Sequence, residues 1–160
     1  MAGSSATILL MTQAELKEMM KESMRAKNTV KLAVVRGLIS AMTNEAVAKG
    51  KGPDGVLSPD EVLGVLTRAA KQRKDSIQRF EAGGRPELAA GEKEELAIIE
   101  TMLPAQMSQA DIVAAAKAKA TELGVADKTG ANKLMGMLMK DLKGKADGTA
   151  VKAVVDNLFQ

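Results

Sequence analysis

Aromatic side chains are nearly absent from this sequence, in which Phe80 and Phe159 are the only two. A core without rings must be filled by aliphatic side chains, and the chain carries eleven methionines, which are flexible, unbranched core fillers. Residues that favour helices are abundant, whereas residues typical of strands are scarce. The sequence therefore predicts an all-α protein with its methionines mainly in the core, although methionine stripes also occur on adaptable binding surfaces.

Caps and breaks divide the chain into helices. Thr12 and Glu15 have the spacing of a capping box, and Ser58, followed by Pro59 and Glu61, is a typical helix start. Glycines and prolines end the helical patterns. Together these signals predict seven helices, over about residues 12–27, 30–49, 58–83, 86–103, 108–123, 131–142 and 147–158.

The predicted helices become shorter after Pro104, and this change predicts two domains. We expect an N-terminal helical domain of about four helices over residues 12–103 and a small three-helix C-terminal domain over residues 108–160, joined by a linker at Leu103–Ser108. Residues 1–11 are expected to be a disordered extension, with Met11 as an alternative start. The apolar run in this extension is too short for a signal peptide, and no stretch of the chain is long enough to span a membrane, so we expect a cytoplasmic protein.

Missing residue types exclude many catalytic centres. The chain has no Cys and no His, so it cannot carry a thiol nucleophile or a cysteine-based metal site, and it lacks the commonest general base near neutral pH. Its glycines do not have the spacing of a phosphate-binding loop. The carboxylates Glu92, Glu94, Glu95 and Glu100 fit the solvated acidic face of an amphipathic helix. We therefore expect no catalytic residue, no metal site and no cofactor.

The third predicted helix carries the first candidate binding surface, which consists of five basic residues: Arg68, Lys71, Arg73, Lys74 and Arg79. Arg68, Lys71 and Arg79 can share one face of a helix over about three turns, with Asp75 between them. The alternative is a solvated surface in which Lys71 and Asp75 form an i,i+4 ion pair. Because the formal net charge is only +3, nucleic-acid binding would have to depend on local clusters such as this one.

The second candidate surface surrounds the end of the sixth predicted helix, where Lys140, Lys143 and Lys145 lie close together in the sequence. Gly144 allows the chain to turn sharply, so that lysines on both sides can project toward one phosphate backbone. The alternative is that these lysines only stabilise the negative end of the helix dipole. No aromatic residue lies nearby in the sequence, so any RNA contact would be with backbone or shape rather than with stacked bases.

Two groups of motifs resemble the GatB/YqeY family. The first resembles the central segment of YqeY-type proteins, and it comprises Lys71-Gln72-Arg73-Lys74-Asp75-Ser76-Ile77, Phe80, Gly83-Gly84-Arg85, Glu92–Leu96 and Leu103-Pro104-Ala105-Gln106. The second resembles the tail domain of the GatB subunit of a tRNA-dependent amidotransferase, and it comprises Met135-Gly136-Met137-Leu138-Met139-Lys140 and Lys143-Gly144-Lys145-Ala146-Asp147-Gly148. The resemblance covers about Thr12 to Leu158.

The resemblance implies a four-helix N-terminal part, a three-helix C-terminal domain and a function in translation. In the amidotransferase, the related tail helps to engage tRNA, whereas ammonia release and transfer occur elsewhere. The family name carries a carbon–nitrogen ligase activity with glutamine as amido donor, but no residue of this chain supports an intrinsic activity. We therefore expect a non-catalytic accessory module that binds tRNA or assists tRNA-dependent amidation. The alternative is a protein-interaction module that docks on an amidotransferase or another translation enzyme through its Met-rich helices.

Overall fold

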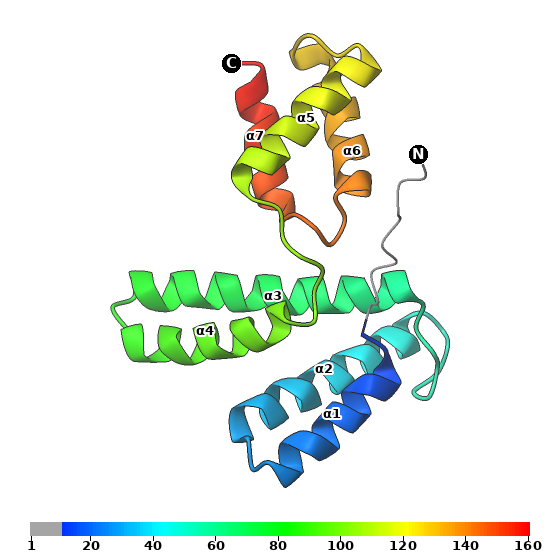
Figure 1. Ribbon diagram of the computed structural model, residues 1–160, viewed down its shortest axis with the longest axis vertical. Coiled ribbons are helices and arrows are strands. Elements are labelled where there is room, and N and C mark those ends of the chain that lie inside the picture. The colour runs from blue at the N-terminus through cyan, green and yellow to red at the C-terminus, as the bar shows by residue number, and fades with distance from the viewer. Residues whose placement is uncertain (1–10) are drawn as a thin grey trace, which may run out of the picture. The chain divides into compact units, whose positions relative to one another are not determined.

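The computed structural model describes residues 11–160, in which helices are the only regular secondary structure and no strand occurs (Figure 1). Residues 1–10, most of the predicted extension, lie outside the described residues. Met11 is partly buried and packs against the first hydrophobic core. The elements are α1 (Gln13–Arg25), α2 (Thr29–Ala48), α3 (Pro59–Ala82), α4 (Pro86–Glu100), α5 (Gln109–Leu123), the 3-10 helix η1 (Lys128–Gly130), α6 (Ala131–Asp141) and α7 (Gly148–Leu158).

Local capping explains where several of these helices begin. The Thr12 hydroxyl accepts a hydrogen bond from the Glu15 amide at 3.2 Å, and the Glu15 carboxylate accepts one from the Thr12 amide at 2.7 Å. Ser58 and Glu61 form the same reciprocal pair at the start of α3. Such a capping box satisfies backbone donors that the first turn of a helix leaves without partners. Both starts agree with the capping signals in the sequence.

The chain forms two compact units, the first ending at Pro104 and the second spanning Ala105–Gln160. In the first unit α1 packs against α2, and α3 lies alongside α4, which runs back along it (Figure 1). Leu16, Val35, Leu66 and Ile99, one from each helix, are almost fully buried in the core of this unit. Amphipathic helices of this kind are stabilised mainly by burying their apolar faces against one another.

The second unit has its own core, formed by α5, α6 and α7. Ala116 on α5, Leu134 and Leu138 on α6, and Val151 and Val155 on α7 are at most 1% exposed. Gly124 ends α5 in the left-handed conformation, with φ +66°, which a glycine adopts without the cost that a side chain would bring. Each unit therefore buries a separate set of aliphatic side chains.

Most methionines for which burial is described serve these cores, as the composition predicts. Met42 and Met102 are buried in the first core, and Met19 and Met20 pack against it. Exposed methionines are Met24, Met137 and Met139. Among residues 11–160, no helix is both long enough and apolar enough to cross a membrane.

Candidate nucleic-acid interface

The basic residues of α3 are mostly engaged in ion pairs within the first unit. Arg68 pairs with Glu45 on α2, and Lys71 pairs with Asp75 at 3.7 Å along α3. Lys74 lies 3.9 Å from Glu100 on α4. The Lys71–Asp75 pair is the i,i+4 ion pair expected if this face of the helix is only a solvated surface. These basic residues therefore already have acidic partners, which an RNA phosphate would have to displace.

Arg73 connects α3 to α4 through two carboxylates. Its guanidinium lies 3.2 Å from a Glu92 carboxylate oxygen and 2.6 Å from one of Glu95, in a geometry that suits the planar, forked Arg side chain. Lys93 on α4 adds a further pair with Glu81 on α3 at 2.6 Å. The acidic face of α4 is thus less solvated than the sequence interpretation supposes, because Glu92 and Glu95 hold a basic side chain of the neighbouring helix.

Arg79 is the exception among the five candidates on α3. It is exposed and makes no ion pair within residues 11–160. One free arginine is a weak anchor for a nucleic acid, since binding strength grows with the number of phosphates that are neutralised. The structure therefore does not bring the five α3 candidates together as a free basic surface.

Lys140, Lys143 and Lys145 have a different environment. We call residues 140–145 the lysine turn: Lys140 lies in the last turn of α6, and Lys143 and Lys145 follow in the turn beyond it. All three lysines are exposed, and none forms an ion pair with any residue of the described chain. Lys140 lies in the last turn of α6 and Lys143 directly follows its C-cap, so interaction with the helix dipole is the alternative for these two lysines.

The acidic residue within the lysine turn, Asp141, and the one just after it, Asp147, already have other partners. Asp141 lies 2.8 Å from Lys119 on α5, and this hydrogen bond, together with a second to Glu122, raises the pKa of Lys119. Asp147 accepts a hydrogen bond from the Thr149 amide at 2.7 Å and so caps α7. Among residues 11–160, neither of these carboxylates pairs with a lysine of the turn.

The backbone of the lysine turn has a defined conformation. Gly144 is buried and adopts φ +75°, a conformation that favours glycine. The Lys145 and Ala146 amides both donate to the Leu142 carbonyl, at 2.9 and 3.1 Å. The sequence predicts a sharp turn at Gly144, and these bonds show how the chain closes it.

A second set of hydrogen bonds to the turn could not be read from the sequence. The Gln106 side-chain amide donates to the Gly144 carbonyl at 2.8 Å, and the Met107 backbone amide donates to the Lys145 carbonyl at 2.7 Å. Gln106 and Met107 lie in the segment predicted to be a linker, but both are bonded to the second unit. In the sequence, Leu103-Pro104-Ala105-Gln106 and the lysine turn are two separate motifs. Only the structure shows that they are joined by hydrogen bonds.

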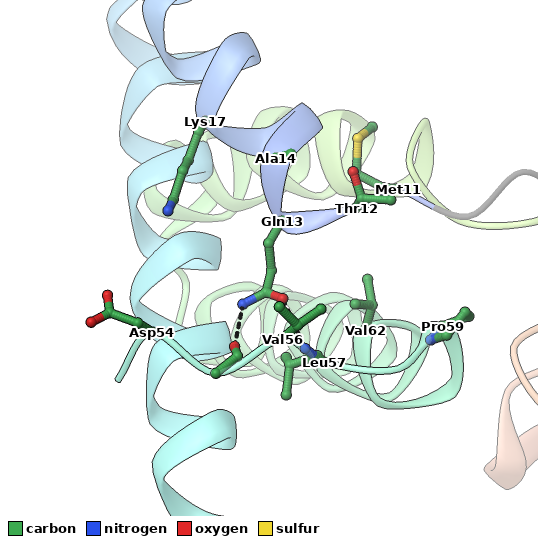
Figure 2. A pocket seen from close by; sticks show the side chains of 11 residues that line it. Met11, Thr12, Gln13, Ala14, Lys17, Asp54, Val56, Leu57, Pro59 and Val62 are labelled. Carbon is green, nitrogen blue, oxygen red and sulfur yellow. Dashed lines mark hydrogen bonds between the residues drawn. The ribbon is translucent and has the colours of Figure 1, made fainter. Parts of the chain in front are cut away.

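An apolar pocket in the first unit contains none of the predicted site residues. Its volume is about 340 Å3, and its walls include Met11, Pro59 and Val62. Figure 2 shows the Gln13 amide reaching from α1 to the loop that precedes α3, where it donates to the Gly55 carbonyl at 3.1 Å and accepts from the Leu57 amide at 2.9 Å. The pocket can hold an apolar group, but no group of metal-ligating carboxylates occurs within residues 11–160.

The described residues define the class of this protein as an all-helical protein of two compact units with an exposed lysine turn. A family model described as "Yqey-like protein" matches residues 13–159, which is nearly the whole chain. The protein therefore belongs to the YqeY-like family, and the resemblance of its motifs to YqeY-type proteins is confirmed.

Curated relatives are fungal proteins called "Altered inheritance of mitochondria protein 41, mitochondrial". The chain is 34% identical to the protein from Lachancea thermotolerans over 62% of this chain and 52% of that protein. It is 38% identical to the Saccharomyces cerevisiae protein over 52% of this chain and 44% of that protein. The matched region thus spans about half the length of these relatives. Their name associates those proteins with mitochondria and mentions no ligand or reaction.

Proposed function

We propose that this protein is a non-catalytic accessory module that binds RNA, with tRNA as the expected class, through the lysine turn. The observation that carries the proposal is the set of three exposed lysines without acidic partners in the described chain, on a turn whose backbone is fixed by hydrogen bonds. A fixed turn presents its charges to a phosphate backbone at a lower entropic cost than a disordered tail does. The resemblance to the tail of a tRNA-dependent amidotransferase supports tRNA as the partner.

The expected contact is with phosphates rather than bases. Lysine ammonium groups release counterions from the nucleic acid when they neutralise phosphates, so the affinity falls as the salt concentration rises. Three such contacts give a slope of log affinity against log salt of about −2 to −3. The only aromatic side chain of the second unit, Phe159, packs against its core, which supports a shape-directed contact without base stacking.

The proposal also covers how the chain is organised and what it assists. The four helices of the first unit and the three α-helices of the second are proposed to be separate domains, with the lysine turn in the second. We infer that the protein assists tRNA-dependent amidation or a related step of translation and has no ligase activity of its own. The α3 residues Arg68, Lys71, Arg73 and Lys74 are not part of the proposed interface, because they pair with carboxylates.

The test compares two triple variants of equal charge. In the first, Lys140, Lys143 and Lys145 are replaced by Ala. In the second, the control, three other exposed lysines of the same unit are replaced by Ala, none of which has an ion pair in the described chain: Lys117, Lys128 and Lys133. Affinity for tRNA is measured over a salt series, and circular dichroism checks that both variants are folded.

We expect the wild type and the control to lose about 20- to 40-fold in affinity between about 50 and 200 mM salt, as three phosphate contacts require. The turn variant should bind more weakly and show a slope near zero. If the turn variant and the control bind tRNA with the same affinity and the same slope, the lysine turn is not an RNA-binding surface.

Exposed methionines favour a second candidate function, docking on a partner protein. Met137 and Met139 on α6 are 37% and 44% exposed, and methionine suits surfaces that adapt to a partner. An apolar contact of this kind would be nearly insensitive to salt, whereas the RNA contact would not be. The cytoplasmic location expected from the sequence stays a prediction, since the name of the fungal relatives associates those proteins with mitochondria.

A further inference from the structure

We propose that Gln106 is a positioning residue for the lysine turn, and that RNA binding at the turn is coupled to the first residues of the second unit. This inference rests on the proposed RNA-binding function. Gln106 and Met107 carry no positive charge, so their chemistry alone does not indicate a part in RNA binding.

Two adjacent hydrogen bonds form the connection, which we call the clamp. The Gln106 side-chain amide donates to the Gly144 carbonyl at 2.8 Å, and the Met107 amide donates to the Lys145 carbonyl at 2.7 Å. These are consecutive carbonyls of the turn, so the clamp fixes the peptide planes on both sides of Lys145. One of the two bonds depends on a side chain, which makes it accessible to mutation.

The clamp meets the turn at a buried glycine that lies between two exposed lysines. Gly144 is buried where it accepts the Gln106 amide, whereas Lys143 and Lys145 on either side of it are exposed. The internal bonds from the Lys145 and Ala146 amides to the Leu142 carbonyl close the turn, and the clamp adds one hydrogen bond each from Gln106 and Met107. With both sets of bonds present, the two lysines have fixed backbone origins and project into solvent.

Positioning and charge make different contributions to binding. Removing a lysine removes a phosphate contact and lowers the salt slope. Removing the Gln106 amide leaves the lysines in place but allows the turn to sample more conformations, which adds an ordering cost to binding. Loss of one hydrogen bond of this type corresponds to about a 3- to 10-fold weaker affinity, at an unchanged salt slope.

Thermodynamic linkage then couples the turn to the first residues of the second unit. If the clamped conformation binds RNA more tightly than the unclamped one, RNA must stabilise the clamp by the same factor. Gln106 and Met107 follow directly after the boundary between the two units at Pro104 and Ala105. Bound RNA should therefore slow hydrogen exchange at the Met107 amide, which is one of the two clamp donors.

The test uses Gln106→Met, which keeps the length of the side chain and removes the donor. The control is Gln109→Met, at an exposed glutamine a few residues further along that donates no side-chain hydrogen bond within the described chain. Binding of tRNA is measured across a salt series for both variants and for the triple lysine variant. Hydrogen exchange at Met107 is followed by NMR with and without tRNA, and circular dichroism verifies folding.

We expect Gln106→Met to bind tRNA about 3- to 10-fold more weakly with the wild-type salt slope. Exchange at Met107 should be faster in this variant, and tRNA should protect that amide less than it does in the wild type. The inference is overturned if Gln106→Met binds as tightly as wild type while the triple lysine variant has lost binding, and in that case the RNA-binding proposal stands. If the triple lysine variant itself binds like wild type, the proposed function and this inference both fail.

Discussion

Leu134→Ala should unfold the second unit and leave the first one folded. Leu134 on α6 has no exposed surface and lies in the middle of the second core, among side chains of α5 and α7. The cluster of side chains around Leu134 contains no residue of the first core. The substitution therefore tests whether the two compact units also behave as two thermodynamic units.

The expected magnitude follows from the size of the unit and the burial of the residue. Replacing a fully buried Leu by Ala costs about 3–5 kcal/mol, through lost transfer free energy and the cavity that is left. A unit as small as Ala105–Gln160, at about 0.05–0.15 kcal/mol per residue, has a total stability of about 3–8 kcal/mol. The cost is comparable with the total, so the second unit of the variant is expected to be marginal or unfolded in water.

The two phenylalanines provide one reporter for each unit. Phe80 lies on α3 in the first unit, and Phe159 packs against the core of the second. Incorporation of a fluorinated phenylalanine at both positions allows fluorine NMR to follow urea unfolding of each unit separately. Met137→Ala, at a partly exposed position of the same helix, is the matched control, with an expected change within about 0.5 kcal/mol.

The reasoning predicts that the Phe159 signal shifts to its unfolded position at low urea in Leu134→Ala, with the Phe80 midpoint unchanged. A common shift of both midpoints would show that the units unfold as one cooperative structure. A Phe159 midpoint equal to that of the Met137→Ala control would show that the second core does not depend on Leu134.

Two further predictions concern the first unit. Gln13→Ala removes two hydrogen bonds to the loop before α3 and should cost about 1–3 kcal/mol, with faster hydrogen exchange at the Leu57 amide; wild-type exchange there would contradict it. The hydrogen bond from Lys51 lowers the pKa of Glu61 to about 2, below its usual value of 4.5. Because the pKa is lower in the folded state, the stabilisation is complete above the usual value and is lost as the pH falls through about 2. The stability difference between wild type and Glu61→Gln in urea unfolding should therefore shrink on acidification from about pH 5 to about pH 2, and a constant difference would exclude this linkage.

Helix positions were predictable because they depend on short-range chemistry. The capping boxes at Thr12 and Ser58 and the glycine ending at Gly124 each involve residues within a few positions of one another. Signals of this range can be read from a single sequence. The short 3-10 helix at Lys128–Gly130 was not predicted, since it is held by Asp127 and Thr129 in a turn without a regular apolar pattern.

Partners that are distant in the sequence were not predictable in the same way. Arg73 was classed with a basic surface because its neighbours are basic, but its partners Glu92 and Glu95 come from a different helix. Which carboxylate meets which guanidinium depends on how α3 and α4 are aligned along each other. The sequence pattern gives the apolar faces of the two helices but not their axial alignment.

The contrast between α3 and the lysine turn has a physical cause that applies to other near-neutral proteins. Lysines and arginines on helices packed side by side have carboxylates of the neighbouring helix within reach, as Lys74 and Arg73 do. A turn beyond a helix end has few neighbours, and at this one Asp141 is held by Lys119 while Asp147 caps α7. With a formal net charge of only +3, basic residues are nearly balanced by acidic ones, so a surface for phosphates arises where local structure separates the two signs. Counting basic residues along a helix therefore favours α3, whereas accounting for the partners of each carboxylate favours the lysine turn.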